Sequence, residues 1–336
     1  MRVSVRTVSR AAWRCGQSYY ARCVACLFLL ILTPALPIAV GATPAGGASL
    51  VVMGDSYASN GDSVAAMIAA QGWTRACHHS PTSWSSQLAQ RMAFWYQHDF
   101  VDVSCLGASL VTGPGYSLAQ ETKKAFDAGA LGPRTRVVAI QLGINDAWGA
   151  TPATVFKAWM SCLPDFTDGC GIEAASDGRS PDVRGVTGEA YADRIRSVVT
   201  YIRYYARDAK LVIVGYPELN APGRTEWCIN LMGLLRITQD RAGALTEYMD
   251  RLDRAQREAA RLLGLDFFDT RGVTAGHGFC AAEPWLNGMM VFWREPFGIP
   301  FHPTVGGDAI VAAAMQQRWF DNKVVMQQTS NMRDKQ

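Results

Sequence analysis

Charge of either sign is scarce in this sequence, and the charges nearly cancel. Only 18% of the 336 residues are charged and 49% are hydrophobic, which suits one sizeable domain with a large core. Five of the 32 basic residues lie before residue 44, where there is no acidic residue, so 27 basic and 29 acidic residues remain. A near-neutral domain lacks the basic surface that nucleic acid requires, so we expect no such partner.

Several motifs that carry chemistry are also missing. Beyond the first 42 residues no Cys-x-x-Cys pair occurs and no histidine stands at zinc-ligand spacing from a cysteine, so we expect neither a metal nor a cofactor. The Gly-x-Ser-x-Gly elbow is absent, which disfavours the α/β-hydrolase fold. No internal repeat or low-complexity tract is present.

A single long apolar run occurs, over residues 24–40, and Pro34 and Pro37 interrupt it. It follows a basic leader and precedes small residues, which is the layout of a secretory signal peptide over residues 1–42, cleaved after Ala42 or Ala45. The alternative is an uncleaved signal anchor that tethers the protein to a membrane, but 17 residues are short for a span. We therefore expect a secreted domain over residues 44–324, with a flexible polar tail over 325–336.

Cysteine usage agrees with export. Three of the nine cysteines lie in the leader, and an even number remains, which in an exported domain predicts three disulfides. Counting alone leaves fifteen pairings open. The six cysteines are Cys77, Cys105, Cys162, Cys170, Cys228 and Cys280.

Five short β-like runs alternate with helical stretches. Three of the runs are almost continuously apolar, as strands covered on both faces are. This alternation predicts an α/β fold with a five-stranded parallel sheet between two layers of helices, a flavodoxin-like α/β/α sandwich. The expected strands are 48–56, 100–109, 136–146, 210–218 and 265–270, and the expected helices are 83–97, 189–208, 239–263 and 304–320. Residues 161–188 and 271–303 are expected to be irregular.

Polar and glycine-rich signatures stand at the carboxyl ends of the expected strands, where ligand sites gather in such sheets. Gly-Asp-Ser occurs twice, at Ser56 and at Ser63. Ser56 directly follows an apolar strand, so its hydroxyl would project into the cleft beside free backbone N–H groups, as a nucleophile requires. Ser63 does not follow a strand and is expected to cap a helix or lie on a turn.

Four short blocks in order resemble the SGNH (GDSL-type) hydrolases, and more closely the secreted, disulfide-bonded esterases and lipases of actinobacteria. The resemblance covers roughly residues 48–320. The blocks are "MGDSYAS" with Ser56, "CLGAS" with Gly107, "LGIND" with Asn145 and "FHPTVGGD" with His302. The resemblance implies a metal-independent serine esterase that acts as a monomer on small-molecule, lipid or acylated-glycan esters.

The roles carry over by motif position. Ser56 would attack the ester carbonyl and His302 would serve as base and then acid. The backbone N–H groups of Ser56 and Gly107 and the side-chain amide of Asn145 would form the oxyanion hole. Two further motif residues, Asp55 and Asp146, are expected to brace loops. The resemblance also implies the pairs Cys77–Cys105, Cys162–Cys170 and Cys228–Cys280.

One departure from the family pattern concerns the acid that orients the histidine. Many members carry Asp three residues before it, where this chain has Ile299. The disulfide-bonded relatives use a main-chain carbonyl, so the Ile299 carbonyl is the expected partner of His302 Nδ1, with Pro300 as the alternative. Asp308 is expected to point away, inside the last helix, and nothing in the sequence supports Glu295.

The residues alone leave alternatives for the base, for the aromatic stretch and for the activity. His277 rivals His302 on position alone, and "FHPT" favours His302. The aromatic stretch over 285–301 could line an acyl groove, cover the site as a lid, or pack against the sheet edge. The expected activity is hydrolysis of lipid or short-acyl carboxylic esters. The alternatives are deacetylation of an acylated polysaccharide and a non-catalytic binding protein on the same fold.

Overall fold

The computed structural model describes residues 46–61, 77–111, 116–231, 235–288 and 298–321. The chain divides into Met1–Ala42 and Thr43–Gln336, and all described residues belong to the second unit. The expected signal peptide over 1–42 and polar tail over 325–336 lie outside the described residues. Within the described ranges, no helix is long and apolar enough to cross a membrane.

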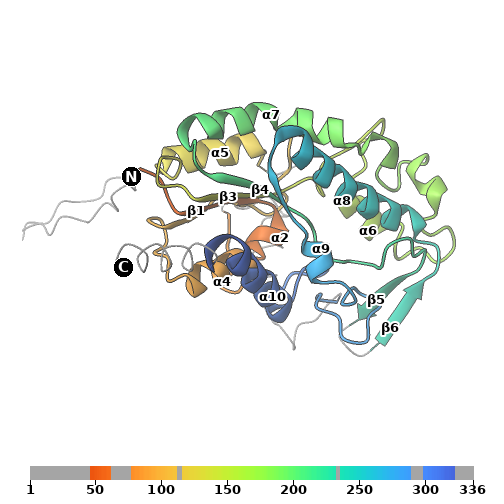
Figure 1. The fold of residues 1–336 in the computed structure, drawn as a ribbon. Coiled ribbons are helices and arrows are strands. Elements are labelled where there is room, and N and C mark those ends of the chain that lie inside the picture. The colour runs from red at the N-terminus through yellow and green to blue at the C-terminus, as the bar shows by residue number, and fades with distance from the viewer. Residues whose placement is uncertain (1–45, 62–76, 112–115, 232–234, 289–297, 322–336) are drawn as a thin grey trace, which may run out of the picture. The chain divides into compact units, whose positions relative to one another are not determined.

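A five-stranded parallel sheet forms the centre of the second unit, in the order β2-β1-β3-β4-β7 (Figure 1). β1 and β3 are buried along their whole length because helices cover both faces. The five strands match the five expected runs, although each is shorter. They are β1 (Leu50–Gly54), β2 (Phe100–Asp102), β3 (Val137–Gln141), β4 (Lys210–Val214) and β7 (Asp266–Phe268).

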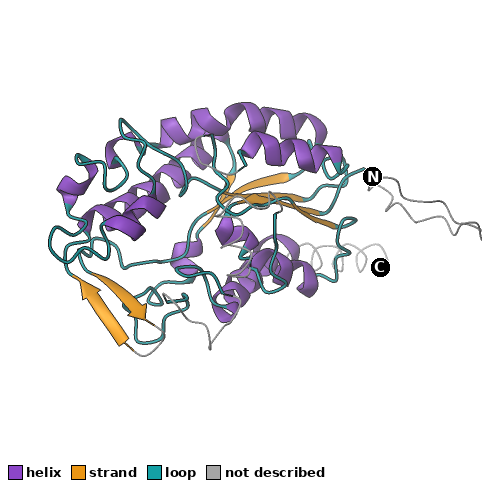
Figure 2. Cartoon of the chain, turned by 180° about the vertical axis from the view of Figure 1, so that it is seen from behind, coloured by secondary structure: helices purple, strands orange, loops and turns teal. Residues whose placement is uncertain are grey.

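Helices cover the two faces of this sheet separately, as both views show (Figures 1 and 2). Side chains alternate along β1, so Val51 and Met53 join the core under α5, α7 and α8, whereas Leu50 and Val52 join the core over α4 and α10. The expected three-layer α/β/α sandwich is therefore confirmed. The longer helices are α4 (Trp84–Arg91), α5 (Leu118–Asp127), α7 (Gly188–Tyr205), α8 (Gly243–Leu263) and α10 (Val305–Gln316).

Several elements were not expected from the sequence. An antiparallel hairpin of β5 (Trp227–Leu231) and β6 (Leu235–Gln239) lies outside the main sheet. Helix α5 was missed although its start has a readable capping box, in which Ser117 and Gln120 bond reciprocally. The remaining short elements are α2 (Ser56–Ser59), α6 (Val155–Ser161), α9 (Thr270–Val273), η1 (Ile172–Ala175), η2 (Val183–Gly185) and η3 (Gln317–Asp321).

Three disulfides join Cys77 to Cys105, Cys162 to Cys170 and Cys228 to Cys280. These are the pairs that the resemblance implies. The first ties a segment that follows α2 in the sequence to the loop after β2. The second closes part of the 161–188 segment, and the third ties the β5–β6 hairpin to the chain that leads towards His302.

Candidate active site

The turn after β1 exposes one hydroxyl at the edge of the sheet. Asp55 caps helix α2, and its side chain accepts a hydrogen bond from the backbone N–H of Tyr57. Ser56 is the first residue of α2 and is 8% exposed. A Cβ atom at Gly54 would lie only 2.6 Å from the Ala58 side chain, so glycine is required for this tight strand-to-helix turn.

The structure brings together the serine and histidine blocks, which are far apart in the sequence. His302 Nε2 lies 2.7 Å from Ser56 Oγ. His302 Nδ1 lies 2.8 Å from the carbonyl oxygen of Pro300. Because a carbonyl can only accept, the proton of the neutral ring is on Nδ1, and Nε2 is free to accept the serine hydroxyl proton. This is the geometry of a nucleophile and its base.

The expectation that the Ile299 carbonyl orients His302 is wrong, and the alternative, the Pro300 carbonyl, takes this place. Ile299 O accepts the backbone N–H of His302 at 3.2 Å, so it closes a turn rather than facing the ring. Phe301 lies inside this turn with a φ of 67°, a left-handed conformation that is rare for a bulky residue. That conformation places Pro300 O, rather than Ile299 O, against Nδ1.

Burial decides the protonation state of the histidine. His302 is 5% exposed, and burial lowers the pKa of its ring from 6.5 to about 4, although the Pro300 carbonyl acts in the opposite direction. The ring is therefore neutral at neutral pH, as a general base must be.

The three expected oxyanion donors follow the neighbouring strands β1, β2 and β3. Across the described ranges, the backbone N–H groups of Ser56 and Gly107 have no hydrogen-bond acceptor. Gly107 has a φ of 72°, which favours glycine, and no described atom lies within 4 Å of where a Cβ would stand. The Asn145 amide donates one hydrogen to Ala108 O at 3.0 Å, which leaves its second hydrogen for a ligand.

Asp146, the residue after Asn145, braces the loop that carries Gly107. Its carboxylate accepts the backbone N–H groups of Leu110 and Val111 at 2.7 and 3.1 Å. Arg194 pairs with the same carboxylate at 2.9 Å. These contacts hold the loops after β2 and β3 together, which is the role expected for Asp146.

Asp55 braces the turn that carries Ser56. Its second carboxylate oxygen lies 2.5 Å from the hydroxyl of Tyr216, and that hydroxyl accepts the backbone N–H of Ile144 at 3.1 Å. Burial raises the pKa of Asp55 to about 7, against the opposing effect of the Tyr216 hydrogen bond. The bonded chain connects the Ser56 turn to the residue before Asn145.

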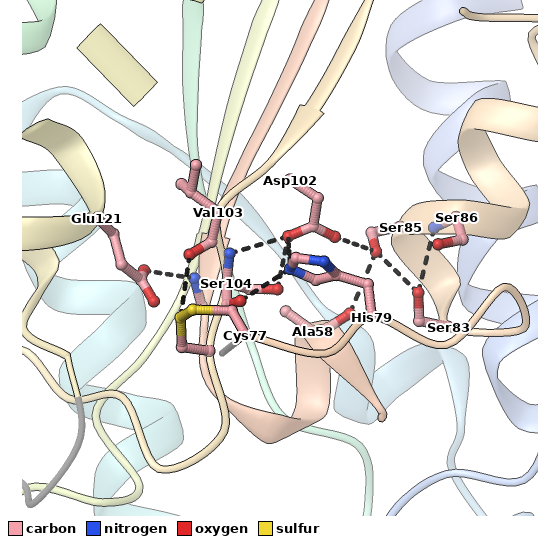
Figure 3. A network of polar contacts seen from close by, with 12 residues as sticks. Ala58, Cys77, His79, Ser83, Ser85, Ser86, Asp102, Val103, Ser104 and Glu121 are labelled. Atoms are coloured by element: carbon pink, nitrogen blue, oxygen red, sulfur yellow. Dashed lines mark hydrogen bonds and ion pairs between the residues drawn. A yellow bond between two sulfur atoms is a disulfide. The ribbon is translucent and has the colours of Figure 1, made fainter. Parts of the chain in front are cut away.

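Another buried carboxylate, Asp102, joins four segments around the site (Figure 3). It accepts the hydroxyl of Ser85 at 2.7 Å and both the hydroxyl and backbone N–H of Ser104, at 2.5 and 2.9 Å. Ser85 Oγ also lies 3.1 Å from Ala58 O in α2, and His79 Nε2 lies 2.8 Å from Ser104 O. This network could not be predicted from the sequence, because its members are single residues scattered over four segments.

Glu121 is a further buried carboxyl group at the same strand end. It accepts the backbone N–H of Gly54 at 2.8 Å, directly before the nucleophile turn. Burial holds the pKa of Glu121 well above its usual range. Its hydrogen bond supports the last residue of β1, directly before the turn that carries Ser56.

Two other described candidates, Asp308 and His277, have different partners. Asp308 lies in the first turn of α10, buried, where it accepts the Asn60 amide at 2.6 Å. His277 bonds through Nδ1 to Glu283 O and stacks on Trp285. Ser63 and Glu295, and most of the aromatic stretch over 285–301, lie outside the described residues.

Comparison with known proteins agrees with this geometry. Residues 52–310 match the GDSL-like Lipase/Acylhydrolase family. An esterase of Streptomyces scabiei is 28% identical over 282 residues, which are 74% of this chain and 78% of that protein. The match spans most of the described sheet and both blocks that carry Ser56 and His302. The chain is therefore a carboxylic ester hydrolase and belongs to the GDSL-like lipase/acylhydrolase family.

Solved structures share the fold. Phospholipase A1 from Streptomyces albidoflavus superposes with a TM-score of 0.53 at 22% identity, over 80% of this chain and 98% of that one. The extracellular lipase of Streptomyces rimosus gives a TM-score of 0.50 at 20% identity, over 80% and 99% of the two chains.

Proposed function

We propose that this protein hydrolyses carboxylic esters through a Ser56–His302 pair that needs no triad carboxylate. Ser56 Oγ attacks the ester carbonyl carbon while His302 Nε2 takes the hydroxyl proton. The tetrahedral intermediate then expels the alcohol, which leaves with that proton, and an acyl group remains on Ser56. Water attacks this acyl group with His302 again as base, so that the carboxylic acid and free Ser56 are regenerated. The observation that carries the proposal is the 2.7 Å contact between His302 Nε2 and Ser56 Oγ.

The negative charge of the intermediate is stabilised by the backbone N–H groups of Ser56 and Gly107 and by the free amide hydrogen of Asn145. This assignment is supported because, among the described residues, the two backbone N–H groups have no other hydrogen-bond acceptor. Removing one such donor typically costs about 2.7–4 kcal/mol of transition-state stabilisation.

The substrate that we propose is a lipid or short-acyl ester, met outside the cell. The curated relative from Streptomyces scabiei carries the name esterase. Three disulfides together with the basic and apolar leader favour an oxidising compartment and export by a signal peptide.

A panel of substrates tests this function. Purified protein without its leader is given p-nitrophenyl esters from acetate to palmitate, a phospholipid and acetylated xylan, with Ser56→Ala as the matched control. Turnover of the p-nitrophenyl esters that is lost in Ser56→Ala supports the proposal. Preference for acetylated xylan over every other ester would replace the substrate with an acylated polysaccharide. No turnover of any ester would leave a binding protein on this fold and refute the proposal.

A further inference from the structure

Tyr57, the residue directly after the nucleophile, lies against the base. Its ring is 1% exposed and stacks on the imidazole of His302, with ring centroids 4.3 Å apart and an interplanar angle of 27°. Tyr216 packs on the Tyr57 ring in a T-shaped arrangement, with ring centroids 5.1 Å apart. The His302 ring is thus held on one face as well as at both nitrogens, and this face contact stops rotation about its last side-chain torsion.

The hydroxyl of Tyr57 reaches the backbone beside the histidine. It donates to the carbonyl oxygen of Phe301 at 3.0 Å. Phe301 is the residue in the left-handed conformation, and it stands between Pro300, whose carbonyl bonds His302 Nδ1, and His302 itself. Such a conformation persists only where surrounding contacts fix it. Trp159 and Phe279 pack on the Phe301 ring. The backbone N–H of Phe301 donates to Asn287 O at 2.9 Å, and the Tyr57 hydroxyl holds its carbonyl.

Other described side chains do not replace this support. Within the described part of the chain, no carboxylate bonds to His302 Nδ1, and the Pro300 carbonyl fixes the ring at one point alone. Tyr57 adds two independent constraints, one on the plane of the ring and one on the turn. It also follows Ser56 without a break, so movement of the nucleophile turn moves the support of the base with it.

We propose that Tyr57 is the positioning residue for His302 and takes over the orienting part of a triad carboxylate. The ring holds the imidazole plane, and the hydroxyl holds the turn that presents the Pro300 carbonyl. This inference rests on the proposed function of Ser56 and His302. It predicts that two variants lose different parts of the support.

The two variants are Tyr57→Phe and Tyr57→Leu, assayed for ester hydrolysis over pH 3.5–8. In Tyr57→Phe we expect kcat to fall about tenfold with KM within twofold, because the turn loosens while the ring stays. In Tyr57→Leu we expect kcat to fall at least a hundredfold. Water then reaches the imidazole, so the acid limb of the pH profile moves up by at least one pH unit. Restoring the ring with Phe returns the limb to its wild-type position.

Tyr191→Phe is the matched control, because Tyr191 also donates a buried hydroxyl to a carbonyl, Leu142 O at 2.8 Å, without touching the histidine turn. We expect it to lower the unfolding temperature as much as Tyr57→Phe does while kcat stays within twofold. Wild-type kcat in both Tyr57 variants, or losses that follow the unfolding temperature equally in all three proteins, would overturn the inference. If the wild-type protein itself hydrolyses no ester, that result would instead overturn the proposed function.

Discussion

The burial of His302 predicts an unusually acid-tolerant reaction. The pKa of the ring is lowered from 6.5 to about 4, with burial as the main cause. The base is active only when neutral, so kcat/KM falls as the pH drops through the pKa that His302 has in the folded protein. At pH 5.5 a ring with a pKa of about 4 is roughly 97% neutral, whereas an unperturbed ring is roughly 9% neutral. We therefore expect activity at pH 5.5 to stay near its plateau, about tenfold above that of an unperturbed histidine.

The assay is kcat/KM for a water-soluble ester between pH 3.5 and 8, in parallel with an NMR titration of the ring protons. His98→Gln is the control, because His98 is an exposed histidine outside the site. Its profile should superpose on that of the wild type. An acid limb with a midpoint at 6.5 or above, in protein that circular dichroism shows to be folded, would refute the argument from burial.

Stability is a poorer probe of the same group. Because the pKa of His302 is lowered in the folded protein, the unfolded chain binds more protons between pH 4 and 6.5. The free energy of unfolding therefore falls as the pH drops through this range. Asp55 has a pKa raised from 3.8 to about 7, so its contribution is present at low pH and lost as pH rises through 7. The two slopes oppose each other over pH 4–6.5, and the kinetic limb therefore reports His302 more directly than the unfolding temperature.

Further predictions concern the loops and the covalent frame. Asn145→Ala should lower kcat about 10²–10³-fold with little change in KM, and an unchanged kcat would remove the amide from the oxyanion hole. Arg194→Met leaves the buried Asp146 carboxylate without its cation; since Arg194 is one-fifth exposed, we expect a loss near the lower end of about 3–5 kcal/mol in urea unfolding. Glu295→Gln should keep activity within about tenfold, and a thousandfold loss in folded protein would indicate a carboxylate triad. Non-reducing peptide mapping of the protein without its leader should find the three disulfides described above and no free thiol; any other pairing would contradict the structure.

Most of the sheet could be predicted because β1, β3 and most of β4 are buried on both faces and form apolar runs in the sequence. The amphipathic helix α8 could be predicted for a similar reason, since its buried residues recur at helical spacing. The β5–β6 hairpin could not, because it lies outside the main sheet and β6 is mostly exposed. Its strands have no continuous apolar run to mark them.

The site could be predicted where the motif residues stand at the ends of adjacent strands, since parallel strands bring their ends to one edge. The orienting carbonyl could not be predicted, because the choice of Pro300 over Ile299 depends on the left-handed conformation of Phe301. Tyr57 belongs to the block "MGDSYAS", but the sequence does not reveal its role. Its contact with His302 depends on how a loop 244 residues further along folds back over α2.

The most direct test of the central claim is to find the residue that a fluorophosphonate labels. The active protein is treated with the reagent, digested and mapped by mass spectrometry, with Ser56→Ala and Ser63→Ala as paired variants. We expect one adduct, on Ser56, which is retained in Ser63→Ala, lost in Ser56→Ala, and formed in proportion to the loss of esterase activity. An adduct on Ser63, or full inactivation without an adduct on Ser56, would contradict this claim.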